Sequence, residues 1–382
     1  MQFLHNLSVV TRAKDWRLSF VPFIMGCVYM WLWWFQLPCT AHTILLTFLS
    51  LITTIGFASL GYFINEFFDK ASDAKAGKLN KLTFIAPPLQ FAIFASSVAL
   101  TFLPWIWLPA SKFSWLLIGV QISLFLIYSL PFPRLKESTY LSVIIDALYA
   151  YVVPLALSFY TFSLIANTLH FPAWFYLFAV AVFFIGLRNI IIHQADDIMK
   201  DKQSGMKTLP MILGIANTKI LLQTVLLYEV LFSTLWMLLL GVERFIFLPC
   251  LIVYLLLAVY SANDVNTRVH NKNSQFIINN AYQYLIPLVM ILLLTINDVK
   301  WLAILPLHVM LLVPFHLLQK TLNIINSFIS VIHRFVLNDV RNFVSAAINY
   351  PIYYCLLMFG VDLKKEQMSA WEFLQSRIKK GQ

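Results

Sequence analysis

Long apolar runs alternate with short polar connections along most of this 382-residue chain. Each run has about 20 residues, the length that a helix needs to cross the hydrocarbon core of a bilayer. We place nine such runs at residues 18–37, 42–64, 84–108, 113–131, 140–164, 172–192, 220–240, 245–261 and 276–297. The pattern predicts an all-α, polytopic transmembrane helical bundle with about nine spanning helices.

The chain continues well beyond the ninth run. Residues 301–318 are apolar, but two prolines and a histidine interrupt them, so they form either a poor tenth span or a re-entrant segment. In residues 321–349 the polar groups recur with a period of roughly 3.6, which predicts an amphipathic helix lying at the membrane interface. We therefore expect a transmembrane domain at residues 1–300 and a C-terminal extension at residues 301–382.

The composition agrees with a membrane location. The chain is 60% hydrophobic and 12% charged, with a mean hydropathy of +0.78, whereas a soluble domain has roughly 25% charged residues. The net charge of +10 could suit a nucleic-acid partner, but the distribution of the charge argues against one. Sixteen Lys and Arg residues lie in the N-terminus and in every second connection, whereas the other connections hold only Lys112, Arg244 and Lys300.

This asymmetry follows the rule that positively charged connections remain in the cytoplasm. It predicts that the N-terminus and the connections after the second and sixth spans are cytoplasmic. We expect an integral, multi-pass protein of a bacterial inner membrane. Its partner is the lipid bilayer, and we expect no nucleic-acid partner.

Two groups of acidic residues lie where apolar runs end. The first stripe consists of Asn65, Asp69 and Asp73, and the second stripe of Gln194, Asp197 and Asp201. Residues four apart on a helix lie on one face, with Cβ atoms about 6 Å apart. Mg²⁺ takes oxygen ligands and is usually held by one or two carboxylates together with substrate phosphates. The two stripes therefore suit a shared site for Mg²⁺ and a diphosphate.

A solvated helix end or an ion-coupled transporter could also account for these acids. A single stripe is compatible with an ordinary solvated helix end, but two stripes with the same Asp-x-x-x-Asp spacing on the same predicted side favour a shared site. An ion-coupled transporter is the alternative of another class. Transporters, however, bind their ions near the bilayer midplane, often on helices broken by Gly or Pro, whereas these acids lie at the edge of unbroken apolar runs.

Three motifs, taken together, resemble those of the UbiA-type intramembrane prenyltransferase superfamily. The first stripe matches the family's Asn-x-x-x-Asp-x-x-x-Asp motif. Asp197 and Asp201, followed by Gly205 and Thr208-Leu209-Pro210, match its second motif of two aspartates, a glycine and a Thr-Leu stretch. The segment from Tyr128 to Lys136 reads Tyr-Ser-Leu-Pro-Phe-Pro-Arg-Leu-Lys, similar to the family's Tyr-Ser-x-Pro-Pro-x-Arg-x-Lys segment after its fourth helix.

The start of the chain adds a further likeness. Arg12 with Trp16 looks like the family's Arg-Pro-x-x-Trp entry into the first helix, although Ala13 replaces the proline. The resemblance covers roughly residues 10–297, so it implies that the domain at residues 1–300 is a UbiA-like prenyltransferase domain. Glu66 in place of an aspartate, the missing Arg-Pro-x-x-x-Gly stretch and the C-terminal extension depart from the family pattern. These departures concern the acceptor and leave the metal and diphosphate motifs intact.

The resemblance implies a mechanism and a set of site residues. Two Mg²⁺ ions would bridge the diphosphate of an isoprenoid donor to the metal ligands Asn65, Asp69, Asp73, Asp197 and Asp201. The catalytic residues would be Asp69, Asp73, Asp197 and Asp201. The residues binding substrate would be Asn65, Arg134, Lys136, Tyr128, Gln194 and Arg12. Arg134 and Lys136 suit a clamp on the diphosphate, because cationic side chains stabilise the negative charge that develops as it leaves; alternatively, the two cations serve membrane topology alone.

We predict Mg²⁺-dependent transfer of a prenyl group from a polyprenyl diphosphate to an acceptor, aromatic or otherwise lipophilic, that the sequence does not identify. The same scaffold hosts terpene cyclases and polyprenyl-phosphate phosphoribosyltransferases, which stay open as alternatives. Polar residues within the spans either line an acceptor pocket or hydrogen-bond between helices. Asp146 is the most notable of them, because an unpaired carboxylate inside the membrane is costly.

Overall fold

The computed structural model consists of helices joined by short connections, with no strand among the residues it describes. These residues are 2–75, 77, 79–132, 135–198, 202, 207–243, 247–267, 277–313 and 315–334. The chain divides into two compact units, the first unit at residues 1–321 and the second unit at residues 322–382. The prediction of an all-α protein is confirmed.

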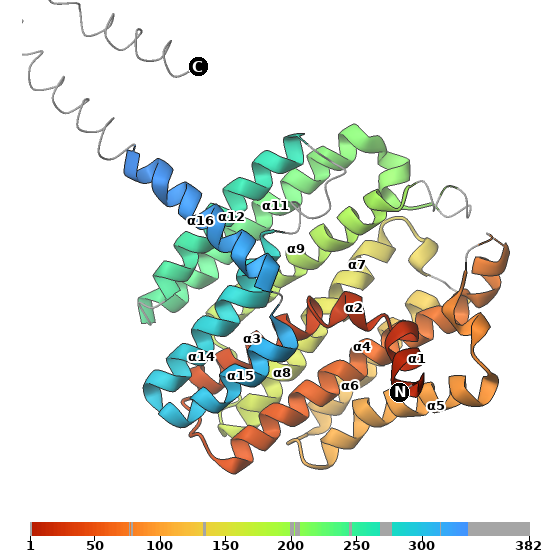
Figure 1. Cartoon of the computed structure of the whole chain (residues 1–382), viewed down its shortest axis with the longest axis horizontal. Helices are drawn as coiled ribbons and strands as arrows, with labels where there is room; N and C mark the ends of the chain where they lie inside the picture. Colours follow the sequence, from red (N-terminus) through yellow and green to blue (C-terminus); the bar gives the residue numbers. More distant parts are fainter. Residues whose placement is uncertain are drawn as a thin grey trace, which may run out of the picture. The chain divides into compact units, whose positions relative to one another are not determined.

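The first unit is a bundle of apolar helices (Figure 1). Its elements are α1 (Gln2–Val10), α2 (Ala13–Trp16), α3 (Phe20–Trp34), α4 (Ala41–Lys75), η1 (Lys81–Phe84), α5 (Pro87–Phe102), η2 (Leu103–Ile106), α6 (Lys112–Ser129), η3 (Leu135–Glu137), α7 (Leu141–Ala147), η4 (Leu148–Val152), α8 (Val153–Ile165), α9 (Ala173–Asp196), α11 (Leu209–Glu243), α12 (Phe247–Thr267), η5 (Ala281–Leu285), α14 (Ile286–Asn297), η6 (Val299–Ala303) and α15 (Ile304–Leu312). The last described helix, α16 (Phe315–Arg334), continues into the second unit.

Six of the described helical runs are long and apolar enough to cross a membrane. They correspond to the second to seventh spans expected from the sequence. The first, eighth and ninth expected spans coincide with shorter apolar helices, as does the segment Val299–Val309. The membrane character is therefore confirmed, whereas the expected number of nine spans is not.

Helix α3 is surrounded by other helices although it is one of the shorter ones. Every residue from Val21 to Trp33 is buried, and the helix contacts α4, α8, α14 and η5. Trp31 packs against Trp174 and Phe159, with ring centroids 5.9 and 4.9 Å away. A helix that is apolar on all sides, as this one is, is the kind that a bundle buries completely.

Two π-helical segments, η4 and η5, interrupt the regular helical runs. Each precedes a helix whose second residue is a proline, Pro154 in α8 and Pro287 in α14. Proline has no N–H to donate to the preceding turn, so the regular hydrogen-bond ladder cannot pass through it. Single π turns of this kind often lie at functional sites, and η4 begins directly after the turn that carries Asp146.

The first unit includes residues that follow the ninth expected span. His308 of α15 is buried, and its Nδ1 lies 3.1 Å from the Tyr29 hydroxyl of α3. Asn280 donates a hydrogen bond of 2.6 Å to Thr321. The first part of the amphipathic helix expected at residues 321–349 falls on α16, and the rest lies outside the described residues. The functional division at residue 300 stays a prediction.

Candidate functional site

The first stripe lies on a single helix. Helix α4 continues to Lys75, well past the end of the expected span at residue 64, so Asn65, Asp69 and Asp73 follow one another at four-residue intervals on one face. The Oδ1 atom of Asn65 is buried and has no hydrogen-bond partner among the described residues. An unsatisfied buried oxygen of this kind is expensive unless a ligand completes it.

Lys136 of η3 reaches the first stripe from a distant part of the sequence. Its ammonium group forms an ion pair with the carboxylate of Asp69, and both side chains are largely shielded from solvent. Lys136 thus lies beside the first stripe, as a clamp on a shared ligand requires. Arg134 lies outside the described residues.

Asn80 is a neighbour of the first stripe that the sequence analysis missed. Its Nδ2 donates to the Oδ2 of Asp73 at 2.9 Å and to the main-chain oxygen of Glu66 at 2.8 Å. Its Oδ1 accepts from the N–H of Leu82 and so caps η1. Asn is a common N-cap residue, a signal that locates η1 in the sequence but does not reveal the bond to Asp73.

Arg12 also lies at this end of α4, but its partner is Glu66. Its Nη2 and Nε lie 2.8 and 2.9 Å from the Glu66 Oε1 atom, and the guanidinium carbon is 5.8 Å from the centroid of the Tyr62 ring. Burial alone would lower the pKa of Arg12, but the charge and hydrogen bond of Glu66 outweigh it and raise the pKa. Burial, aided by the charge of Arg12, lowers the pKa of Lys81 on the other side of Glu66. A role for Arg12 in substrate binding stays a prediction.

The second stripe begins at the end of α9. The helix ends at Asp196, and Asp197 is the C-cap residue of the helix. The Nε2 atom of His193 lies 3.7 Å from the Oδ2 atom of Asp197. The Nε2 of Gln194 lies 3.4 Å from the hydroxyl of Ser142 in α7, and its Oε1 is buried without a partner among the described residues. Asp201 lies outside the described residues.

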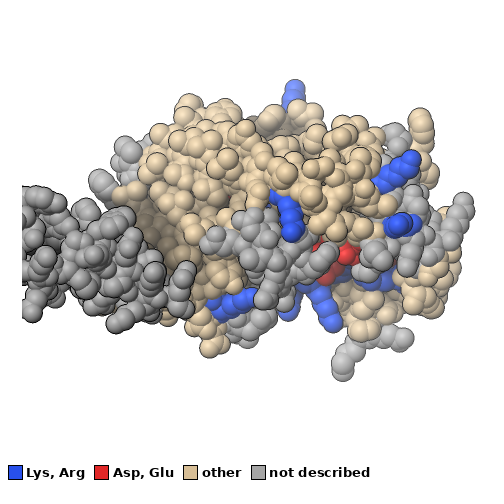
Figure 2. Space-filling view, turned by 90° about the horizontal axis from the view of Figure 1, so that it is seen from above, with Lys and Arg blue, Asp and Glu red and all other residues tan. Residues whose placement is uncertain are grey.

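A short segment joins the two stripes. Lys136 contacts Asp69 of the first stripe, and Ser142, six residues later, contacts Gln194 of the second. The described residues of the two stripes therefore lie near each other at one end of the bundle. Figure 2 shows a face of the molecule on which the visible Asp and Glu side chains are grouped in one place, with several Lys and Arg side chains around them.

The donor set fits a metal that is shared with a ligand. No three His, Cys, Asp or Glu side chains come together as a metal site within the described part of the chain. Mg²⁺ is usually bound by only one or two carboxylates, with phosphate oxygens and water completing its shell. Carboxylates on the first stripe, together with the unsatisfied Oδ1 of Asn65, provide the oxygen ligands for such a site.

A buried ionic network lies deeper in the bundle. Arg188 of α9 donates to the carboxylate of Glu229 in α11, at 2.6 Å from Nε and 3.1 Å from Nη2. Its Nη2 also lies 2.5 Å from Asn279 Oδ1, and Asn189 continues the network to the Tyr151 hydroxyl. The pairing neutralises both charges and joins three segments of the chain.

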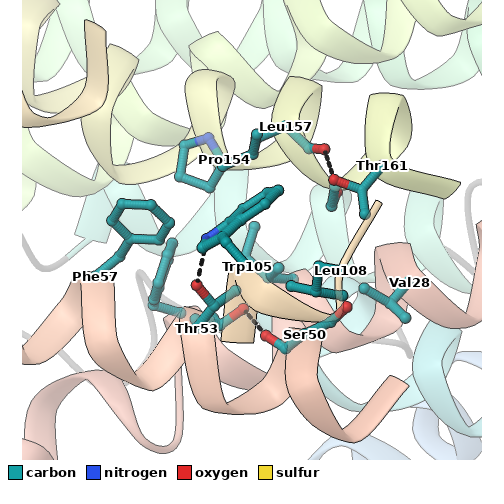
Figure 3. A pocket seen from close by; sticks show the side chains of 13 residues that line it. Val28, Ser50, Thr53, Phe57, Trp105, Leu108, Pro154, Leu157 and Thr161 are labelled. Atoms are coloured by element: carbon teal, nitrogen blue, oxygen red, sulfur yellow. Dashed lines mark hydrogen bonds between the residues drawn. The ribbon is translucent and has the colours of Figure 1, made fainter. Parts of the chain in front are cut away.

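A small pocket, lined mostly by apolar side chains, lies between α3, α4, η2 and α8, with a cavity volume of about 30 Å³ (Figure 3). Its residues on α4 run from Ser50 to Phe57, so it begins eight residues, or about 12 Å, from Asn65 along the helix axis. The indole N–H of Trp105 donates to the Thr53 hydroxyl at 3.1 Å, which satisfies both groups. None of the predicted site residues lines this pocket.

Comparison with known proteins identifies the fold. A model of the UbiA prenyltransferase family matches residues 19–281. A UbiA homologue from Archaeoglobus fulgidus bound to GPP and Mg²⁺ is 19% identical with a TM-score of 0.57, and the match covers 76% of this chain and 99% of that one. The same homologue bound to DMAPP and Mg²⁺ is 16% identical, with a TM-score of 0.56 and the same coverage.

A UbiA homologue from Aeropyrum pernix K1 has the same fold. It is 15% identical with a TM-score of 0.54, and the match covers 72% of this chain and 97% of that one. No curated protein sequence matches this chain. At these identities the solved structures establish the architecture only.

Proposed function

The chain belongs to the UbiA prenyltransferase family, and we propose that it transfers a prenyl group from an isoprenoid diphosphate to a lipophilic acceptor within the membrane. The observation that carries this proposal is the joining of the two stripes by the segment from Lys136 to Ser142. This arrangement puts carboxylates, a cation and unsatisfied amide oxygens at one end of an apolar bundle, as a ligand with a charged head and a hydrocarbon tail requires. The solved homologues with GPP or DMAPP and Mg²⁺ support this assignment.

In this proposal the residues of the site have two roles, metal binding and diphosphate binding. Asn65, Asp69, Asp73, Asp197 and Asp201 would hold Mg²⁺, two ions in our proposal, and the metal would neutralise the diphosphate as the bond to the prenyl carbon breaks. Lys136 would bind the same anion from the other side, since a preorganised cation stabilises charge that develops on the leaving group.

The prenyl cation must be kept from water and stabilised until the acceptor reacts. Tyr128 and Tyr149, with ring centroids 5.4 Å apart, and Phe125, 5.1 Å from Tyr149, offer π faces for a cation beside the Lys136 segment. We also propose that the N-terminus and both stripes are cytoplasmic, because the Lys and Arg residues are concentrated in that set of connections.

The experiment uses the full chain in membranes or detergent with Mg²⁺ and a panel of labelled donors, namely prenyl diphosphates of several lengths and phosphoribosyl diphosphate. The wild-type protein should release diphosphate, and Asp69→Asn and Asp197→Asn should each abolish the release. Asp298→Asn is the matched control, because asparagine can retain the cap on η6 and the residue lies outside the site. Mg²⁺-dependent release that persists in either site variant would overturn the assignment. Release from phosphoribosyl diphosphate alone, or a cyclised product, would identify one of the two alternative activities.

A further inference from the structure

Asp146 is a carboxylate inside a membrane-spanning run that the proposed diphosphate site does not use. It lies in α7, within the apolar run Leu141–Ile165. The hydroxyl of Tyr149 donates to its Oδ2 at 2.5 Å. Ionisable groups within a membrane span are rare and by default mark a functional site.

The hydrogen bond of Asp146 does not hold two helices together. Tyr149 is three residues away in the same helical run, so the bond cannot join two segments that are distant in the sequence. The buried Arg188 differs, because it binds Glu229 in another helix and Asn279 in a third segment. The usual structural role of an intramembrane polar residue, a bond between helices, therefore accounts for Arg188 but not for Asp146.

The position of Asp146 relates it to both stripes. Ser142, one turn earlier on α7, bonds to Gln194 of the second stripe, so Asp146 lies about 6 Å deeper along the helix axis. Tyr62, one turn before Glu66 on α4, is close enough for electrostatic interaction with the Asp146 carboxylate. Gly186 of α9 allows α7 to pack closely against α9, because a Cβ there would lie 2.8 Å from Ala147. Asp146 is thus placed just below the level at which a diphosphate would bind.

The surroundings of Asp146 are aromatic and accessible. The carboxylate lies deep among the helices, yet the residue is only partly buried, and the same holds for Tyr149 and Tyr62. Part of the surface of these three residues therefore remains accessible. The Tyr149 ring lies against Tyr128 and Phe125, the rings that we propose to face the prenyl cation.

We propose that Asp146 is the base that receives the proton lost by the acceptor. This inference rests on the proposed prenyl transfer. In that reaction the C–O bond of the donor breaks, and its electron pair leaves with the diphosphate. A bond then forms between the prenyl carbon and a neutral nucleophile, a hydroxyl oxygen or an arene carbon, and the proton on that atom passes to the Asp146 carboxylate. The Tyr149 hydroxyl holds the carboxylate in place.

The test separates cleavage of the donor from transfer. Wild-type and variant proteins are incubated with labelled geranyl diphosphate or geranylgeranyl diphosphate, Mg²⁺ and a lipid extract of the source membranes, and released diphosphate and prenylated lipid are measured together. Asp146→Asn should release diphosphate within about threefold of the wild-type rate. Its prenylated product should fall at least about 100-fold, the usual contribution of a general base, with the label appearing as prenyl alcohol instead.

Two further variants guard against misfolding and a purely structural effect. Tyr149→Phe keeps the carboxylate and the aromatic ring but removes the hydroxyl that anchors the carboxylate, so the prenylated product formed per diphosphate released should fall about tenfold, the equivalent of one lost hydrogen bond. Asp146→Glu should partly restore product formation. A product yield in Asp146→Asn equal to that of the wild type would overturn the inference. If Asp146→Asn does not fold, a product yield in Tyr149→Phe equal to that of the wild type would overturn it instead. So would equal loss of cleavage and transfer with normal donor binding, because Asp146 would then act on ionisation. If the wild type cleaved no prenyl diphosphate, the proposed function itself would be refuted.

Discussion

The ion pair between Arg188 and Glu229 allows a quantitative test of the fold that supports the second stripe. Arg188 is 2% exposed and Glu229 is 0% exposed, and two hydrogen bonds of 2.6 and 3.1 Å join them. Asp197, the C-cap residue of α9, lies nine residues after Arg188, or about 14 Å along the helix axis. The pair therefore fixes the helix that brings Gln194 and Asp197 to the site.

Replacing one partner should be much more costly than replacing both. Arg188→Met leaves the carboxylate of Glu229 buried without its countercharge, and breaking a buried pair in this way costs about 3–5 kcal/mol. Replacing both residues by methionine removes both charges and retains volume, so most of that loss should be recovered. The coupling free energy between the two positions should accordingly reach about 3 kcal/mol, well above the roughly 1 kcal/mol typical of neutral hydrogen bonds between membrane helices.

The measurement is unfolding in mixed micelles by titration with sodium dodecyl sulfate, followed by tryptophan fluorescence, on the four members of the double-mutant cycle. Arg17→Met is the matched control, since this arginine is exposed and surface substitutions usually change stability by less than about 0.5 kcal/mol. If Arg188→Met unfolded within about 1 kcal/mol of wild type, the reasoning would be refuted. A double variant no more stable than the single variant would refute it equally.

The remaining predictions concern the ends of the first unit. Truncation after Thr321 removes only the second unit and should leave donor cleavage intact, whereas truncation after residue 300 also removes the buried His308 and should lower the melting temperature. Equal stability of the two truncations would contradict this. Lys136→Ala should raise the KM for the prenyl diphosphate about 10- to 100-fold, because one hydrogen bond to a charged group contributes roughly 1.5–3 kcal/mol. Lys136→Arg should recover part of the lost donor affinity. If Lys136→Ala had the same donor kinetics as the wild type, Lys136 would not bind the donor, and its contact with Asp69 would be purely structural.

Local patterns in the sequence predicted the parts of this protein that depend on local physics. The length of the apolar runs predicted an all-α membrane protein, and the four-residue spacing of Asn65, Asp69 and Asp73 predicted a stripe that α4 does carry on one face. The motifs together also indicated the family that the match over residues 19–281 establishes. The number of spans was less predictable, because α3 is short and is stabilised by the helices around it.

Helix breaks and ends were harder to predict. The sequence predicted a helix at residues 220–240, but α11 begins at Leu209 and bends at Gly214, whose φ of 72° only glycine adopts readily. The second stripe was expected to extend a helix, yet α9 ends at Asp196. The sequence analysis did not predict the two π-helical segments, although each precedes a proline, because the departure from regular geometry depends on packing that single positions do not reveal.

Only the tertiary structure decided which polar residues bind one another. In the sequence, Glu66 is a departure from the family's first motif, in which an aspartate is common at this position. The structure pairs Glu66 with Arg12, which is 54 positions away. Arg188 is one of the polar residues within the spans that were expected either to line an acceptor pocket or to hydrogen-bond between helices, and the structure pairs it with Glu229 of another helix. Periodicity specifies which face of a helix a residue occupies, because that face depends on its own backbone. The partner across the bundle depends on how distant helices pack, as with Tyr29 and His308, which meet across 279 positions.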